Sequence, residues 1–180
     1  MKWQNSDTQY GWLAAALHWL MLLLLVSVFA SMELRGYFPK GSVTRAAMKS
    51  WHYTLGSSVL VLALLRLAIS FTGQVPAISP PPPPLQALAA RLMKLALYGF
   101  MLGMPLLGWA MRSAEGVPVV FFSLPLPALV GASEKLADWF KQLHEAGASV
   151  GYVMIGLHAA AALYHHYIVR DDTLRRILLK

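Results

Sequence analysis

The chain has 180 residues, of which 57% are hydrophobic and only 13% are charged. Soluble domains carry about 25% charged residues, so this composition indicates a membrane protein, and the length suits a single domain over residues 1–180. The formal net charge of +7 suits an anionic lipid surface or an anionic substrate, and with so apolar a chain we expect no nucleic-acid partner. The chain lacks cysteine, which excludes cysteine-ligated iron–sulfur clusters, cysteine zinc sites and c-type haem attachment.

Four apolar segments are each long enough to cross about 30 Å of hydrocarbon as a helix. They cover about residues 11–32, 46–71, 88–111 and 133–169. The first has no formal charge and is too long for the apolar core of a signal peptide, which is the competing interpretation. The sequence therefore predicts an all-α fold, an integral membrane four-helix up-down bundle.

The later segments carry distinct features. The second has Arg66 near its end. The third contains Gly99 and Gly103, a spacing typical of close helix packing, and Pro105, which should kink or loosen the helix. The fourth is longer than a membrane span requires, so one of its ends should project into water or lie at the interface.

The connections between the segments also differ. Glu33–Lys49 carries four basic residues and one acidic residue, and Thr72–Pro84 ends in five consecutive prolines, which favour a stiff polyproline II stretch. Glu115–Ala132 is apolar and rich in proline, as expected at a membrane interface. The tail Arg170–Lys180 is charged, and we expect it to lie in water.

Four spans place both termini on one side of the membrane. Lysine and arginine divide eight to seven between the terminal side, which includes Lys2 and Lys180, and the opposite side. The excess favours cytoplasmic termini only slightly, because the positive-inside rule depends on a clear asymmetry.

Four histidines lie within the apolar segments or at their edges, where an ionisable side chain is costly. They are His18, His52, His144 and His158. His144 and His158 are 14 residues apart on one helix, which is about 21 Å in depth and about 40° around the axis. Up-down topology then pairs His18 with His158 and His52 with His144. Neutral imidazole is a common axial ligand of haem iron, so the pattern predicts two bis-histidine b haems, one near each membrane face. The alternative is that the histidines only pack the bundle.

Small residues lie one helical turn from each of these histidines, where a porphyrin needs room. They are Ala14, Gly56, Gly147 and Ala162. His165 and His166 are different, because they lie beside tyrosines and Arg170 in a composition typical of the membrane interface. We interpret them as interface anchors, with a place beside haem propionates as the alternative.

Several stretches resemble the bacterial cytochrome b561 family. They are ALHWL around His18, MELRGYFP from Met32, SWHYTLG around His52, LHEAGASVGY from Leu143 and IGLHAAAALYHHYIVRDDTL from Ile155. The resemblance covers nearly the whole chain and is strongest to the diheme members that act as superoxide:ubiquinone oxidoreductases. It implies a four-helix bundle in the bacterial inner membrane, cytoplasmic termini, and two b haems held by the four histidines. It also implies electron transfer from superoxide to ubiquinone. Lys94 is a departure, because a related sequence has a histidine there, and the family scheme does not use that histidine as a ligand.

Two further interpretations stay open for the function. The chain could be a haem-containing membrane anchor that relays electrons between a soluble dehydrogenase or hydrogenase and the quinone pool, or a non-redox membrane protein with structural histidines. If the chain oxidises superoxide, Arg35, Arg45 and Lys49 would attract this anion to the outer haem. The same basic loop would equally suit lipid headgroups. Homo-oligomerisation is open as well.

Overall fold

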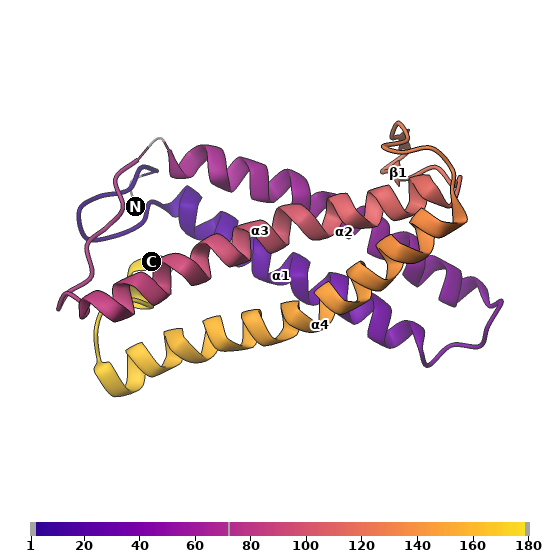
Figure 1. Ribbon diagram of the computed structural model, residues 1–180. Helices are drawn as coiled ribbons and strands as arrows, with labels where there is room; N and C mark the ends of the chain where they lie inside the picture. The colour runs from indigo at the N-terminus through magenta and orange to yellow at the C-terminus, as the bar shows by residue number, and fades with distance from the viewer. Residues whose placement is uncertain (1–2, 72, 179–180) are drawn as a thin grey trace.

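The computed structural model describes residues 3–71 and 73–178. Thr72 in the proline-rich connection and the charges Lys2 and Lys180 lie outside the described residues. The described part contains four long helices, a two-stranded antiparallel hairpin and two short turns near the C-terminus (Figure 1). The elements are α1 Trp12–Arg35, α2 Val43–Ser70, α3 Pro84–Ala114, β1 Val120–Phe121, β2 Leu124–Pro125, α4 Glu134–Tyr164, a π-helical turn His165–Val169 and a 3-10 turn Arg175–Ile177.

The helix boundaries follow local capping chemistry. The Ser42 side chain accepts a hydrogen bond from the backbone N–H of Arg45, so α2 begins three residues earlier than its apolar pattern indicates. Helix α3 begins at Pro84, four residues before the predicted start, because proline is well suited to the first helical turn. Ser133 caps α4 in the same way as Ser42 caps α2.

The helices alternate in direction, as predicted. Residues 3–11, 73–83 and 170–178 lie together at one end of the bundle, here called the terminal end. The connections 36–42 and 115–133 lie at the other end, here called the loop end (Figure 1). All four helices are long and apolar enough to span a membrane, which confirms the predicted membrane four-helix bundle.

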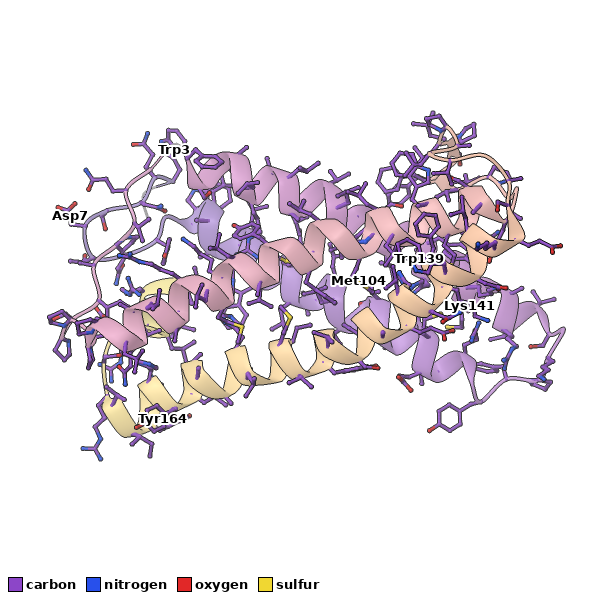
Figure 2. All side chains as sticks on the ribbon, viewed as in Figure 1. Trp3, Asp7, Met104, Trp139, Lys141 and Tyr164 are labelled. Atoms are coloured by element: carbon purple, nitrogen blue, oxygen red, sulfur yellow. The ribbon has the colours of Figure 1, made fainter. Side chains whose placement is uncertain are left out.

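Aromatic side chains mark the two ends of α4. Trp139 lies near its start and Tyr164 at its end, and both are about half exposed (Figure 2). They are 25 residues apart, which corresponds to about 37 Å along a helix. This separation suits two membrane–water interfaces, where tryptophan and tyrosine are enriched.

The buried core lies among α1, α2 and α3. It contains Leu17 and Met21 of α1, Val59 and Leu62 of α2 and Met101 of α3. By contrast, the only residue of α4 that is buried is a glycine. Helix α4 packs mainly on α3, and its backbone hardly approaches that of α1. The fourth helix therefore has little apolar core of its own.

Two glycines allow α4 to approach α3. A Cβ added at Gly147 would lie 2.5 Å from Sδ of Met104, and one added at Gly151 would lie 2.3 Å from the Phe100 ring (Figure 2 labels Met104 at this contact). The close-packing role expected for Gly99 and Gly103 is wrong, because a Cβ added at either would meet nothing within 4 Å. These two glycines lie on a face of α3 that is turned away from the neighbouring helices.

The tail does not lie in water as expected. Asp171 and Arg176 are buried, and the carbonyl of Arg176 accepts a hydrogen bond from the backbone N–H of Tyr10. The indole of Trp19 donates to the carbonyl of Ile177 (3.0 Å). Burial alone would raise the pKa of Asp171, but the hydrogen bonds from His165 and Thr173 outweigh it and hold the pKa below its usual range. The charged tail thus closes the terminal end of the bundle.

We expect Gly151→Val to lower the thermal stability of the purified protein, because the added side chain must displace the Phe100 ring. Overpacking of this kind typically costs about 1–3 kcal/mol. Gly156→Val is the matched control, since it lies on the same helix where a Cβ meets nothing within 4 Å. Thermal melts followed by circular dichroism in detergent measure both, and equal midpoints would show that α3 and α4 are not held together at Gly151.

Candidate functional site

The structure brings the four histidines of the apolar segments together as two pairs. The ring centres of His18 and His158 are 6.2 Å apart, and those of His52 and His144 are 6.1 Å apart. The first pair joins α1 to α4 near the terminal end, and the second joins α2 to α4 near the loop end. Helix α4 thus contributes one imidazole to each pair.

The ring separation in both pairs fits one iron between two imidazoles. Imidazole nitrogens bind a metal at about 2.0–2.1 Å and each ring centre lies about 1.1 Å behind its nitrogen, so the centres lie about 6.3 Å apart across the metal. Among the described residues there is no group of three or more His, Asp or Glu side chains that could hold a metal ion. The donor set is therefore two imidazoles per site, and two imidazoles would suit a b-type haem.

At the loop-end pair, His52 is oriented by a backbone carbonyl. Its Nδ1 lies 3.2 Å from the carbonyl oxygen of Val28 and 3.4 Å from the Ser31 hydroxyl. Donation from Nδ1–H to the carbonyl leaves Nε2 free with its lone pair, which is the usual arrangement of a histidine that binds a metal.

His144 lies against α3. A Cβ added at Gly108 would lie 3.2 Å from its Cε1, so the ring packs closely against Gly108 and a side chain there would have to push it by a few tenths of an ångström. Within the described part of the chain its buried Nδ1 has no hydrogen bond of normal geometry, although the backbone of Met104 lies close enough to act on it. Beside the partner ring, Gly56 leaves space, since an added Cβ would meet nothing within 4 Å. Buried nitrogens beside open space suit a flat ligand with a central metal.

At the terminal-end pair, an arginine contacts the imidazole. Nη2 of Arg66 on α2 lies 3.1 Å from Nδ1 of His18. This contact was missed in the sequence, where Arg66 is a single charge near the end of an apolar segment. A lone charge within a membrane span indicates function, and that signal could have identified it.

The three basic residues considered for anion steering occupy different environments. Arg35 is half-buried and its charge acts on His52, whereas Lys49 is exposed. Arg45 has a structural role, because its Nη1 donates to the carbonyls of Arg35 and Phe38, both at 2.9 Å. It thereby bonds to the last carbonyl of α1, which has no partner within the helix, and to one carbonyl of the connection that follows.

The remaining candidates lie near the terminal end. Nδ1 of His165 is 2.5 Å from Oδ2 of Asp171, so this histidine is a hydrogen-bond partner of the tail. Nδ1 of His166 is buried without a hydrogen bond among the described residues. Lys94 is exposed on α3.

Comparison with known proteins agrees with this architecture. Residues 9–180 match the family described as "Prokaryotic cytochrome b561". The chain is 43% identical over 162 residues to "Cytochrome b561 homolog 1" of Escherichia coli K12, covering 90% of this chain and 92% of that protein. It is 36% identical over 172 residues to "Probable superoxide oxidase CybB" of Yersinia pestis, covering 96% and 97%. It is 33% identical over 190 residues to "Cytochrome b561 homolog 2" of Escherichia coli K12, covering 100% and 96%.

The family match spans the helices that carry both histidine pairs, and the relatives align over nearly their whole lengths. The chain therefore belongs to the prokaryotic cytochrome b561 family, whose members are bacterial membrane proteins that transfer electrons through b haem.

Proposed function

We propose that the chain binds two b haems, one between His18 and His158 and one between His52 and His144, and transfers electrons from superoxide to ubiquinone. The proposal rests mainly on one observation. In each of two imidazole pairs, at opposite ends of α4, the two ring centres are as far apart as two imidazoles that share one metal ion. The similarity to a protein named as a probable superoxide oxidase supports the choice of donor.

The chain's own residues account for orientation and depth. The carbonyl of Val28 accepts a hydrogen bond from Nδ1 of His52, which leaves Nε2 with its lone pair for the metal. His158 lies 14 positions after His144, which separates the two sites by about 21 Å along α4, most of the hydrocarbon thickness. When bound, each haem supplies reversible one-electron iron chemistry between its two imidazoles.

The overall reaction balances with two electrons. Two superoxide anions each lose one electron to give two molecules of oxygen, and one ubiquinone takes up two electrons and two protons to give ubiquinol. In this proposal the loop end faces the periplasm, where superoxide arrives, and both termini are cytoplasmic. The half-buried Arg35 and the exposed Lys49 place positive charge near His52, and such charge raises the encounter rate of an anion.

The first prediction concerns the number of haems. Purified protein should contain two b haems per chain, because two imidazole pairs have the metal-spanning separation. A pyridine haemochrome assay against protein concentration from amino-acid analysis measures the ratio. A ratio near one or zero contradicts the two-haem site.

The second prediction concerns which histidines share a haem. His52→Ala and His144→Ala should remove the same spectral component, and His18→Ala and His158→Ala the other, because each pair holds one iron. Low-temperature difference spectra of reduced protein separate the components. If His52→Ala and His158→Ala remove the same component while the other remains, the pairing is wrong.

The third prediction concerns the loop-end charges. The double variant Arg35→Gln with Lys49→Gln should reduce the rate of haem reduction by superoxide about threefold to tenfold at low salt and flatten its dependence on ionic strength. Arg45 is retained because its side chain holds the loop to the end of α1. Stopped-flow spectroscopy with a superoxide source measures the rate.

The matched control is Arg91→Gln with Lys94→Gln, which removes the same charge from two exposed positions at the terminal end. It should leave the rate unchanged. Equal rates for the loop-end variant and wild type would favour a lipid-binding role for the loop. A chain that superoxide does not reduce at all would favour the membrane anchor that relays electrons for a soluble enzyme.

A further inference from the structure

Arg66 is a half-buried cation within a membrane-spanning helix. Among the described residues it forms no ion pair with a carboxylate, and its one hydrogen-bond contact is with Nδ1 of His18. Two other arginines that are withdrawn from water do have acceptors. Arg112 pairs with Glu115, and Arg176 bonds to the carbonyl of Pro76. An unpaired charge within a span is costly, so an acceptor for Arg66 is to be expected.

His18 cannot be that acceptor once it binds iron. A neutral imidazole has one nitrogen with a proton and one with a free lone pair, whereas a guanidinium has only N–H donors. If Nε2 of His18 binds iron, Nδ1 carries the proton, and if Nδ1 binds iron, it has no lone pair left. In both cases the 3.1 Å contact with Arg66 would lose its acceptor.

Other groups near Arg66 do not solve this problem. Tyr10 and Tyr98 lie within electrostatic range, but a phenol is neutral at pH 7 and cannot balance the charge. The guanidinium of Arg66 contacts His18 and also lies within electrostatic range of His158, so its charge acts on both rings of the terminal-end pair. A b haem between these rings would bring its own anions, because every such porphyrin carries two propionate carboxylates.

We propose that Arg66 is the binding position for a propionate carboxylate of the terminal-end haem, and that its charge makes this haem easier to reduce. Guanidinium binds carboxylate with two parallel hydrogen bonds, which are among the strongest in proteins. A fixed positive charge near the iron also favours the state with one more electron. The proposal rests on the two-haem site, and the haemochrome ratio tests that site separately.

Redox titration of the purified holoprotein tests the charge effect. Arg66→Gln should lower the equilibrium constant for reduction of the terminal-end haem at least tenfold, which is about 59 mV for a one-electron couple. The loop-end haem should keep its potential, and Arg66→Lys should show a smaller shift because it retains the charge without the two-pronged geometry. The components are assigned by the single-histidine variants. Arg91→Gln is the control, since it removes a charge from an exposed position at the same end.

Reconstitution of the full-length apoprotein tests the carboxylate itself. Haem and haem dimethyl ester, whose carboxylates are neutral, are each added to wild type and Arg66→Gln, and retention at the terminal-end site is measured by absorbance. With a propionate partner, the ester should weaken retention in wild type but make little further difference in Arg66→Gln.

Three outcomes would overturn the proposal. One is a potential that stays unchanged in Arg66→Gln, or shifts equally for both haems. The second is a loss of retention with haem dimethyl ester that is equally large in wild type and in Arg66→Gln. Arg66 would then act on His18 or on a quinone oxygen and not on a propionate. The third concerns the case in which Arg66→Gln retains no terminal-end haem. Haem recovered in Arg66→Lys would then support the requirement for a positive charge, whereas an equally empty site in Arg66→Lys would overturn the proposal.

Discussion

The bundle depends on how α4 is held, because this helix carries one imidazole of each pair and buries little apolar surface of its own. Its close contacts with α3 include the glycine approaches at Gly147 and Gly151 and the packing of the His144 ring against Gly108. With α1 it shares side-chain contacts, including a 2.8 Å hydrogen bond from the Tyr152 hydroxyl to Glu33. These contacts set the distance between α4 and the facing helices at a value that two imidazoles and a metal can span.

Each imidazole pair lies near an arginine, but the two arginines have different surroundings. Arg35 is at the end of α1, next to the connection that Arg45 fastens to the same helix end. Arg66 is four residues from the end of α2 and contacts His18 directly. A charge within the span is less screened by water and acts more strongly on its neighbours. The cation at the terminal-end pair therefore has the greater influence on the charge state of its site.

The helical spans and the pairing geometry could be predicted from the sequence because both follow from simple periodicities. A span needs about 20 apolar residues, and 14 residues along a helix fix a depth and a face. The observed starts of α2 and α3 lie a few residues before the predicted ones, because Ser42 and Pro84 extend these helices beyond their apolar runs. The small residue Gly147 was expected to leave room for a porphyrin, but α3 packs into the space beside it.

The interactions that could not be predicted join residues far apart in the chain. Trp19 bonds to the carbonyl of Ile177, and the N-terminal segment and the connection before α3 both contact the tail. A charged stretch normally indicates solvent exposure, and only the folded arrangement supplies the acceptors that bury Arg176. The contact of Arg66 with His18 is also of this kind, because 48 residues separate them.

The shape of the core has a consequence for folding. Buried apolar side chains connect α1, α2 and α3, whereas α4 joins the bundle through glycine contacts, a few side-chain bonds and the histidine pairs. A group bound between the two histidines of each pair would tie α4 to α1 at one depth and to α2 at the other. Any ligand that binds only the folded state adds its binding free energy to stability. With the proposed haems, that contribution would fall on the helix with the least packing of its own, so cofactor binding would be coupled to the final docking of α4.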